Sequence, residues 1–214
     1  MIKSNDYLLK YLAWGLSAIV IGIVVLVWGS GLLWNFNGIS IYQIFPLLGL
    51  IAFSVMWSHY IISFLNKTIF KKTTLGLYYK VTGYIVLIAI IFHPGLLAFQ
   101  RFRDGYGIPE KSLTSYVQNN LKWVVLLGTV SFLVFLLFEL QRFYKEKFWW
   151  KYLIFANEIA MLAIFYHALR LGTNLHGGWF KYVWFFYGVT LIIIFSYYNY
   201  NRIISFISEK HIKI

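Results

Sequence analysis

Two histidines, His93 and His167, are the residues of this chain best suited to do chemistry. Each lies inside a long apolar stretch of the sequence. An ionisable side chain within a membrane span is costly, so its presence favours a functional role. Two imidazoles that face each other at one depth would suit the axial ligation of a heme iron. The elements around them must therefore be membrane helices that bring the two rings together.

The composition is typical of a multi-span membrane protein. Hydrophobic residues make up 60% of the 214 residues and charged residues only 12%, with a mean hydropathy of +0.69. No formal charge occurs between Lys10 and Lys67. Such a chain is too apolar for a soluble domain. It contains no cysteine, which excludes disulfides, iron–sulfur clusters and thiolate-bound metals.

We predict an all-α fold, a single bundle of six transmembrane helices over residues 1–214. Each apolar run is about long enough to cross a hydrocarbon core of roughly 30 Å. The runs cover residues 11–34, 39–65, 75–99, 121–140, 150–171 and 182–200. The N-terminal residues lead directly into the first run, so we expect a first helix there and not a cleaved signal peptide.

The distribution of cations predicts that both termini are cytoplasmic. With that topology 13 of the 19 Lys and Arg residues fall on the inner side, as the positive-inside rule requires. The six on the outer side are Arg101, Arg103, Lys111, Lys122, Arg170 and Lys181. The cations flank spans instead of forming one stripe, which favours contact with membrane lipid and argues against nucleic-acid binding. We expect a multi-pass protein of the cell membrane.

In this topology both histidines lie in the outer half of the bilayer. His93 lies eight residues before Arg101 in a span that runs outward, and His167 lies seventeen residues beyond Trp150 in another. A helix rises about 1.5 Å per residue, so the two rings reach similar depths. Similar depth on two helices is the geometry that one shared metal centre needs.

Small side chains precede both histidines at helical spacing. They are Ala156, Ala160 and Ala163 before His167, and Thr82, Val86 and Ala89 before His93. Such a face could leave a slot for a planar macrocycle, and tight helix packing also selects small residues. The sequence leaves both readings open.

Cations just outside the histidines are candidate partners of heme propionates. Arg101, Arg103, Arg170 and Lys181 are placed for this role, and ordinary interfacial cations are the alternative. His176, in the loop nine residues beyond His167, is a candidate alternative axial ligand or outer metal ligand. A solvated loop histidine is the simpler reading.

The segment Phe92-His93-Pro94, together with the run from Trp150 to His167, resembles the ferric-reductase-like transmembrane domain superfamily. The likeness covers the whole chain in layout and a few residues in motif, including Gly83 ten residues before His93. In this group a six-helix bundle holds heme between histidines of the third and fifth helices. The resemblance therefore implies that His93 and His167 are axial ligands.

The departures from this group imply one heme instead of two. Two-heme members carry further histidines 13 or 14 residues inward, where this chain has Tyr79 or Lys80 and Leu153 or Ile154. Flavin- and nicotinamide-binding domains of larger members have no counterpart in these 214 residues. The layout is most similar to the small single-heme membrane subunit of the periplasmic methionine-sulfoxide reductase system.

The leading hypothesis is therefore transmembrane electron transfer, in a possible oxidoreductase membrane subunit. One heme b on the outer-leaflet side would take electrons from quinol or a separate flavoprotein and pass them to a periplasmic or extracellular acceptor. A bound quinone is a further cofactor that this hypothesis allows. The alternative is a heme-free polytopic protein, either a small transporter or an assembly subunit, whose histidines serve proton coupling or packing.

The roles of two other residues within the spans have two interpretations each. His59 lies toward the inner side, and a packed, hydrogen-bonded histidine competes there with a quinone-site or proton-relay residue. Glu158 lies about 180° around its helix from His167. Pairing with a basic or hydroxyl group competes with proton delivery for that carboxyl.

Overall fold

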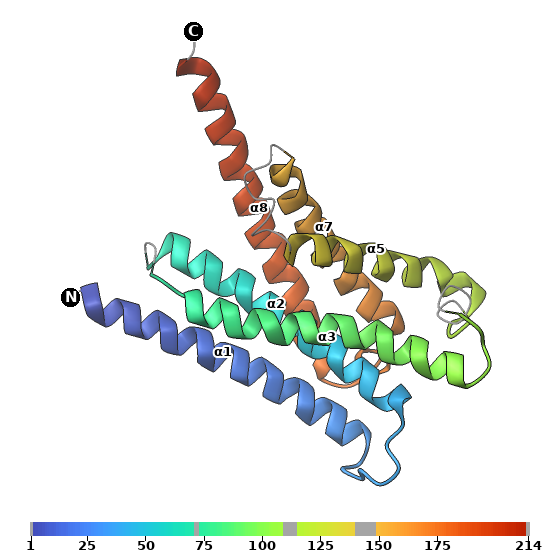
Figure 1. Cartoon of the computed structure of the whole chain (residues 1–214). Coiled ribbons are helices and arrows are strands. Elements are labelled where there is room, and N and C mark those ends of the chain that lie inside the picture. Colours follow the sequence, from blue (N-terminus) through green and yellow to red (C-terminus); the bar gives the residue numbers. More distant parts are fainter. Residues whose placement is uncertain (1, 71–72, 109–114, 140–148, 213–214) are drawn as a thin grey trace.

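The protein is a bundle of long helices in a computed structural model that describes residues 2–70, 73–108, 115–139 and 149–212 (Figure 1). No strand occurs within these ranges. Six long helices are present: α1 (Ile2–Gly31), α2 (Ile41–Thr68), α3 (Gly76–Arg103), α5 (Lys122–Glu139), α7 (Trp150–Leu171) and α8 (Phe180–Ile212). Two short 3₁₀ turns, η1 (Asn119–Leu121) and η2 (Thr173–Leu175), precede α5 and follow α7. Each long helix contains a segment long and apolar enough to cross a membrane. The predicted all-α class and the six apolar helices are confirmed.

The helices extend past the apolar runs where no residue breaks them. α1 begins at Ile2 instead of residue 11, and α8 continues to Ile212 instead of residue 200. Hydropathy marks the apolar part of a helix, whereas the backbone pattern continues through polar residues until a turn or a breaker ends it. The first predicted run ended too late, at residue 34, because the chain turns at Leu33 and Trp34, both with positive φ. Residue 140, the predicted end of the fourth run, lies outside the described residues.

α2 is the central helix of the bundle. It packs against α1, α3, α7 and α8, and it is the most buried of the six spans. Aromatic side chains join it to α8: the ring centroids of Phe53 and Trp184 are 4.4 Å apart, and those of Trp57 and Tyr187 are 4.2 Å apart. The Trp57 indole also donates to the Thr190 hydroxyl at 2.8 Å. These contacts hold α2 against α8.

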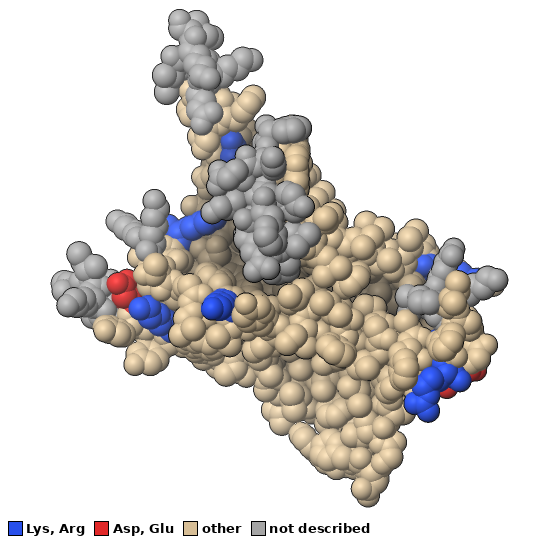
Figure 2. Space-filling view, viewed as in Figure 1, with Lys and Arg blue, Asp and Glu red and all other residues tan. Residues whose placement is uncertain are grey.

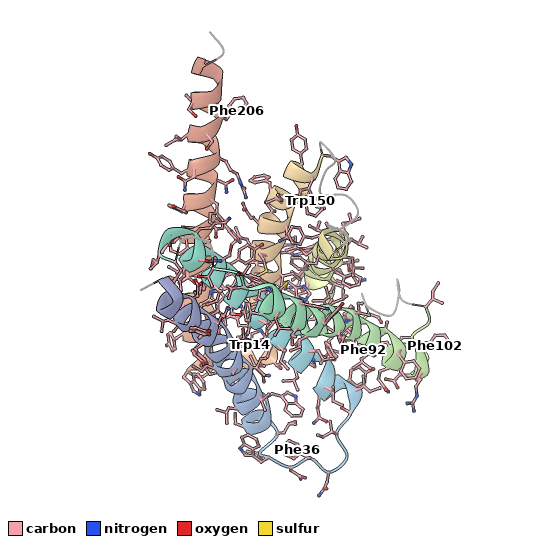
Figure 3. The ribbon with its side chains drawn as sticks, turned by 60° about the vertical axis from the view of Figure 1, so that its left-hand side comes forward. Trp14, Phe36, Phe92, Phe102, Trp150 and Phe206 are labelled. Atoms are coloured by element: carbon pink, nitrogen blue, oxygen red, sulfur yellow. The ribbon has the colours of Figure 1, made fainter. Side chains whose placement is uncertain are left out.

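The surface between the two ends of the bundle is apolar. On the face shown in Figure 2, charged side chains lie toward the ends of the molecule and leave a broad uncharged band between them. Large hydrophobic side chains such as Phe92 and Ile193 are exposed on the helices, and apolar sticks project from the ribbon all around the bundle (Figure 3). This pattern is that of helices that face lipid, and it supports a multi-pass membrane protein.

Candidate functional site

One cavity of about 380 Å³ joins the two histidines. Four helices line it, α2, α3, α5 and α7, and both His93 and His167 belong to its wall. The volume lies within the roughly 300–1,000 Å³ typical of ligand and cofactor pockets. The structure thus brings together the two residues that the sequence singled out.

His93 is fixed by the backbone of α2. Its Nδ1–H donates to the carbonyl oxygen of Phe45 at 2.7 Å. The ring lies against Gly49, one helical turn further along α2: an ideal Cβ at that glycine would stand 2.8 Å from both Cε1 and Nδ1 of the ring. Any side chain at position 49 would displace the imidazole.

His167 is fixed in the same way by the backbone of α5. Its Nδ1–H donates to the carbonyl oxygen of Val124 at 2.8 Å. An ideal Cβ at Gly128 would stand 2.6 Å from Cε1 and Nδ1 of this ring. The accepting carbonyl again belongs to the residue four positions before the glycine. One device therefore occurs twice, once between α2 and α3 and once between α5 and α7. In it a histidine Nδ1–H donates to a backbone carbonyl of the neighbouring helix, and the ring lies against the glycine four residues later.

This device sets the tautomer of both rings. A carbonyl oxygen can only accept, so Nδ1 carries the proton and the lone pair of a neutral imidazole is left on Nε2. No hydrogen bond to Nε2 of either ring occurs among the described residues. Metal-binding histidines characteristically donate the other ring N–H to a carbonyl or carboxylate, which orients the ring and raises its basicity as a ligand. Both rings have that arrangement.

The cavity wall is mainly apolar and aromatic, with polar groups from the ends of its elements. Phe45, Phe53, Phe132 and Phe135 contribute to the apolar part. The polar lining comes chiefly from Tyr42 at the start of α2, Tyr116 beyond α3, and Thr173 and Asn174 beyond α7. A planar ligand could thus lie among flat apolar rings while its polar edge reaches groups at one end of the bundle.

Arg101 is the predicted cation nearest to this polar end. Its guanidinium lies 5.9 Å from the ring centroid of Tyr116, which lines the cavity, and 3.3 Å from that of Tyr106. Its Nη2 also donates to the Ser115 hydroxyl at 2.7 Å, and the side chain is buried. Burial raises the pKa of the Tyr116 phenol while the Arg101 charge lowers it.

Asp104 completes the polar group at this end. Its carboxylate accepts a hydrogen bond from the Tyr42 hydroxyl and another from the Gln100 amide at 2.8 Å. Tyr42 and Tyr116 stack with their ring centroids 5.9 Å apart. Charge of both signs is therefore held beside two tyrosines of the cavity wall.

The other predicted propionate partners and the alternative ligand are not in the cavity wall. Arg103 is exposed beside the Phe99 ring, and Arg170 and His176 are exposed as well. The cavity is also not lined by the stripes of small residues. Val86, Ala89 and Ala160 are buried in the main apolar core, and an ideal Cβ at Gly83 would meet nothing within 4 Å. The room beside the histidines comes instead from Gly49 and Gly128.

We did not predict a role for these two glycines and the two carbonyls from the sequence. A signal for them exists: both glycines end a Leu-Leu-Gly triplet, Leu47-Leu48-Gly49 and Leu126-Leu127-Gly128, within spans that precede a histidine-bearing span. The pairing of each triplet with its histidine depends on helix packing, which the triplet alone does not specify.

His59 is a packed histidine away from the cavity. The Thr82 hydroxyl donates to the Tyr78 carbonyl at 2.7 Å, so the Nε2–H of His59 donates to Thr82 Oγ1 at 2.6 Å. The ring also makes edge contacts with Tyr78 and Tyr79. Unlike the two cavity histidines, His59 has its Nε2 engaged.

Glu158 is paired with a base. Arg202 on α8 donates through Nη2 to Glu158 Oε1 at 2.6 Å and through Nη1 to Oε2 at 3.0 Å. Asn199 adds a third hydrogen bond at 3.2 Å. The predicted pairing with a basic group is thus present.

The inner positions where two-heme proteins carry histidines are filled otherwise. Tyr79 packs against His59, and Leu153 is buried in the bundle. No group of three or more His, Cys, Asp or Glu side chains that could hold a metal ion occurs in the described part of the chain. For a metal that needs six ligands, two imidazoles on one cavity suffice where a macrocycle supplies the other four.

Comparison with known protein families, with characterised proteins and with solved structures finds no match for this chain.

Proposed function

We propose that the cavity binds one b-type heme, with His93 and His167 as the axial ligands, and that the protein transfers electrons within the membrane. The observation that carries the proposal is the repeated device: two imidazoles on one cavity, each held through Nδ1 by a backbone carbonyl and each with an Nε2 that has no hydrogen-bond partner among the described residues. In a mainly apolar cavity these two nitrogen lone pairs have no hydrogen-bond donor in the described part of the chain. Coordination of a metal would give both lone pairs a partner.

The residues present fit such a group. A heme supplies four equatorial nitrogen ligands and a one-electron ferric–ferrous couple, so the protein needs to add two neutral nitrogens. Gly49 and Gly128 let the rings lie close to the backbone, which fixes their orientation. The phenylalanine side chains of the wall exclude water and lower the local polarity, which affects the potential of a bound redox centre.

The polar end of the cavity suits the carboxylates of a heme. Arg101 would contribute a positive charge beside Tyr116, while Tyr42, Thr173 and Asn174 offer hydrogen-bonding groups in the wall itself. Arg103, Arg170 and His176 would then serve as solvated cations or loop groups near this end. A pair of heme-binding histidines on the third and fifth spans would make the chain similar to the ferric-reductase-like superfamily.

The donor follows from the single site. The inner positions hold Tyr79 and Leu153, so the chain offers no second pair of imidazoles as a relay to the opposite leaflet. A membrane quinol that approaches within the bilayer is therefore the preferred donor over a soluble flavoprotein. The acceptor would lie on the outer face, either a periplasmic reductase or an extracellular oxidant such as ferric iron, with the protein in the cell membrane.

The test is the absorption spectrum of the purified full chain, oxidised and then reduced with dithionite. We expect a low-spin spectrum of the bis-histidine type with sharp bands on reduction. A colourless protein, purified from cells that make heme in excess and still colourless after incubation with hemin, would contradict the proposal. That result would favour a heme-free membrane protein such as a transporter or an assembly subunit.

A further inference from the structure

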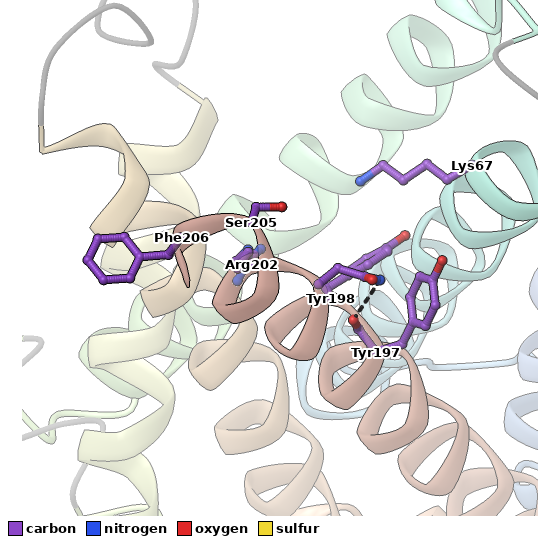
Figure 4. A pocket seen from close by; sticks show the side chains of 7 residues that line it. Lys67, Tyr197, Tyr198, Arg202, Ser205 and Phe206 are labelled. Atoms are coloured by element: carbon purple, nitrogen blue, oxygen red, sulfur yellow. Dashed lines mark hydrogen bonds between the residues drawn. The ribbon is translucent and has the colours of Figure 1, made fainter. Parts of the chain in front are cut away.

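A second recess lies at the other end of α2, between α2 and α8 (Figure 4). It has a volume of about 480 Å³, and its lining consists of Lys67 from α2 and six residues of α8: Tyr197, Tyr198, Asn201, Arg202, Ser205 and Phe206. Lys67 is eighteen residues beyond Gly49, which corresponds to about 27 Å along the helix. The recess is therefore separate from the histidine cavity, and the inference below does not depend on heme.

The two cations of the recess differ in how they are engaged. Arg202 is neutralised by its two hydrogen bonds to Glu158, a buried carboxylate. The Lys67 ammonium lies 4.3 Å from the ring centroid of Tyr198. No ion pair to Lys67 occurs among the described residues. Within the described part of the chain, Lys67 is therefore the cation of this recess that has no direct carboxylate partner.

The ammonium is positioned by its neighbours. The Tyr198 hydroxyl donates to Ser63 on α2 at 3.4 Å, which anchors the ring under Lys67. The Asn201 amide donates to the Tyr197 carbonyl at 3.0 Å, and Asn201 also lines the recess. In Figure 4 the Lys67 side chain extends from α2 toward the α8 side chains across the recess.

The depth of the recess is that of a membrane boundary. Lys67 is one residue from the end of the apolar helix α2, and Ser205 and Phe206 are near the end of the apolar part of α8. Phe206 is exposed and lies on the part of α8 that extends beyond the bundle (Figure 3). Tyrosine and lysine at such a level typically bridge acyl chains and headgroups.

We propose that this recess binds the phosphate of an anionic phospholipid. The Lys67 ammonium would supply a charge-assisted hydrogen bond to a phosphate oxygen. The Ser205 and Tyr197 hydroxyls would supply neutral donors, and Phe206 would contact the first part of an acyl chain. An open recess at the bilayer boundary admits a headgroup whose chains stay in the membrane. A free phosphate ion has the same charge but none of the apolar contact.

The experiment is native mass spectrometry of the delipidated full chain in detergent, titrated with phosphatidylglycerol or with phosphatidylcholine of the same chain length. We expect the first phosphatidylglycerol to bind more tightly than phosphatidylcholine. Lys67→Gln should weaken that binding about tenfold, the order expected for one charge-assisted hydrogen bond. Lys67→Arg should keep it. Lys10→Gln and Lys80→Gln, exposed cations of other helices, are the matched controls and should leave it unchanged.

A second variant tests the recess without removing a charge. Ser205→Trp should fill it and weaken phosphatidylglycerol binding, whether or not Lys67→Gln yields folded protein. Equal binding of the two lipids to the unmodified chain would overturn the proposal, as would an equal loss in the controls. Displacement of phosphatidylglycerol by an equimolar concentration of inorganic phosphate would overturn the lipid assignment.

Discussion

The imidazole of His93 occupies the space in which a side chain at Gly49 would stand, with an ideal Cβ only 2.8 Å from the ring. This contact and the hydrogen bond to Phe45 make α2 a template for the ring on α3. His167 and Gly128 have the same relationship, with a distance of 2.6 Å.

Adding one methyl group at either glycine tests this template. In Gly49→Ala and Gly128→Ala the new Cβ should push the imidazole off its carbonyl partner. Heme affinity should fall roughly tenfold or more, as for other losses of a group that orients a metal ligand. Titration of the apoprotein with hemin measures it.

Gly95→Ala is the matched control, because Gly95 is also in a histidine-bearing helix and an added Cβ there meets nothing within 4 Å. It should bind hemin as the unmodified chain does. An unchanged affinity in both Gly49→Ala and Gly128→Ala would show that the backbone contact does not position the rings.

Removal of either cavity histidine should abolish the low-spin spectrum. His93→Ala and His167→Ala each leave at most one nitrogen ligand, and no other histidine lines the cavity. The protein should still insert, because insertion depends on the hydrophobicity of the spans. Absorption spectra of membranes and of purified protein provide the measurement.

His59→Ala and His176→Ala are the comparison variants, since one ring is hydrogen-bonded to Thr82 and the other is exposed. Both should keep the spectrum. A normal spectrum in His167→Ala together with a lost one in His176→Ala would move the ligand to the loop.

The chain should bind one heme without a covalent link. It has one pair of histidines in the cavity wall and no cysteine for thioether bonds. A pyridine hemochrome assay against protein concentration should give one heme per chain, extractable by acidified organic solvent. Two hemes per chain would mean that the inner half of the bundle binds a second heme although Tyr79 and Leu153 occupy the positions of the inner histidines.

The pair of Glu158 and Arg202 should contribute to stability. Arg202→Gln would leave a carboxylate with a side-chain exposure of 5% without its cation, whereas Arg202 itself is 42% exposed. Because solvent screens the pair, we expect a loss of about 1–2 kcal/mol in unfolding free energy, below that of a fully buried pair. Thermal unfolding in detergent should show a lower Tm.

The double variant Glu158→Gln/Arg202→Gln should recover part of this loss, because it removes the unpaired charge. Arg103→Gln, at an exposed position, should leave Tm unchanged. An Arg202→Gln Tm equal to that of the unmodified chain would show that the pair is only a surface contact.

Both termini are expected on the cytoplasmic side. The prediction follows from the distribution of the 19 Lys and Arg residues: in a six-span topology 13 of them fall on the same side as the two termini. A reporter that is active only outside the cytoplasm should be inactive when fused after Arg202 and active when inserted between Gly177 and Gly178. The opposite pattern would invert the bundle and the assignment of an outer heme.

The sequence alone was sufficient for the number of apolar helices, because long uncharged runs such as that between Lys10 and Lys67 have few other interpretations. It also predicted that His93 and His167 would be close, since depth follows from counting residues along a helix. It did not predict which face of each helix meets which neighbour. The alanines before His167 therefore seemed to offer a slot, while the space is at Gly128 on another helix.

Arg101 and Arg170 illustrate the same limit. Both follow a histidine within one helix by a few residues, but Arg101 turns inward to Tyr106 and Ser115 and Arg170 is exposed. The direction of a side chain at the end of a helix depends on the loop that follows. The conformation of that loop cannot be inferred from the spacing of residues in the sequence.

The two histidine devices belong to separate helix hairpins, α2 with α3 and α5 with α7, and the contacts within each hairpin are far more extensive than those between α3 and α5. A ligand held by both rings would cross-link these hairpins at one point. Its loss should leave each hairpin intact and let one swing relative to the other, so that protease accessibility rises at the seam between α3 and α5 before helix content falls.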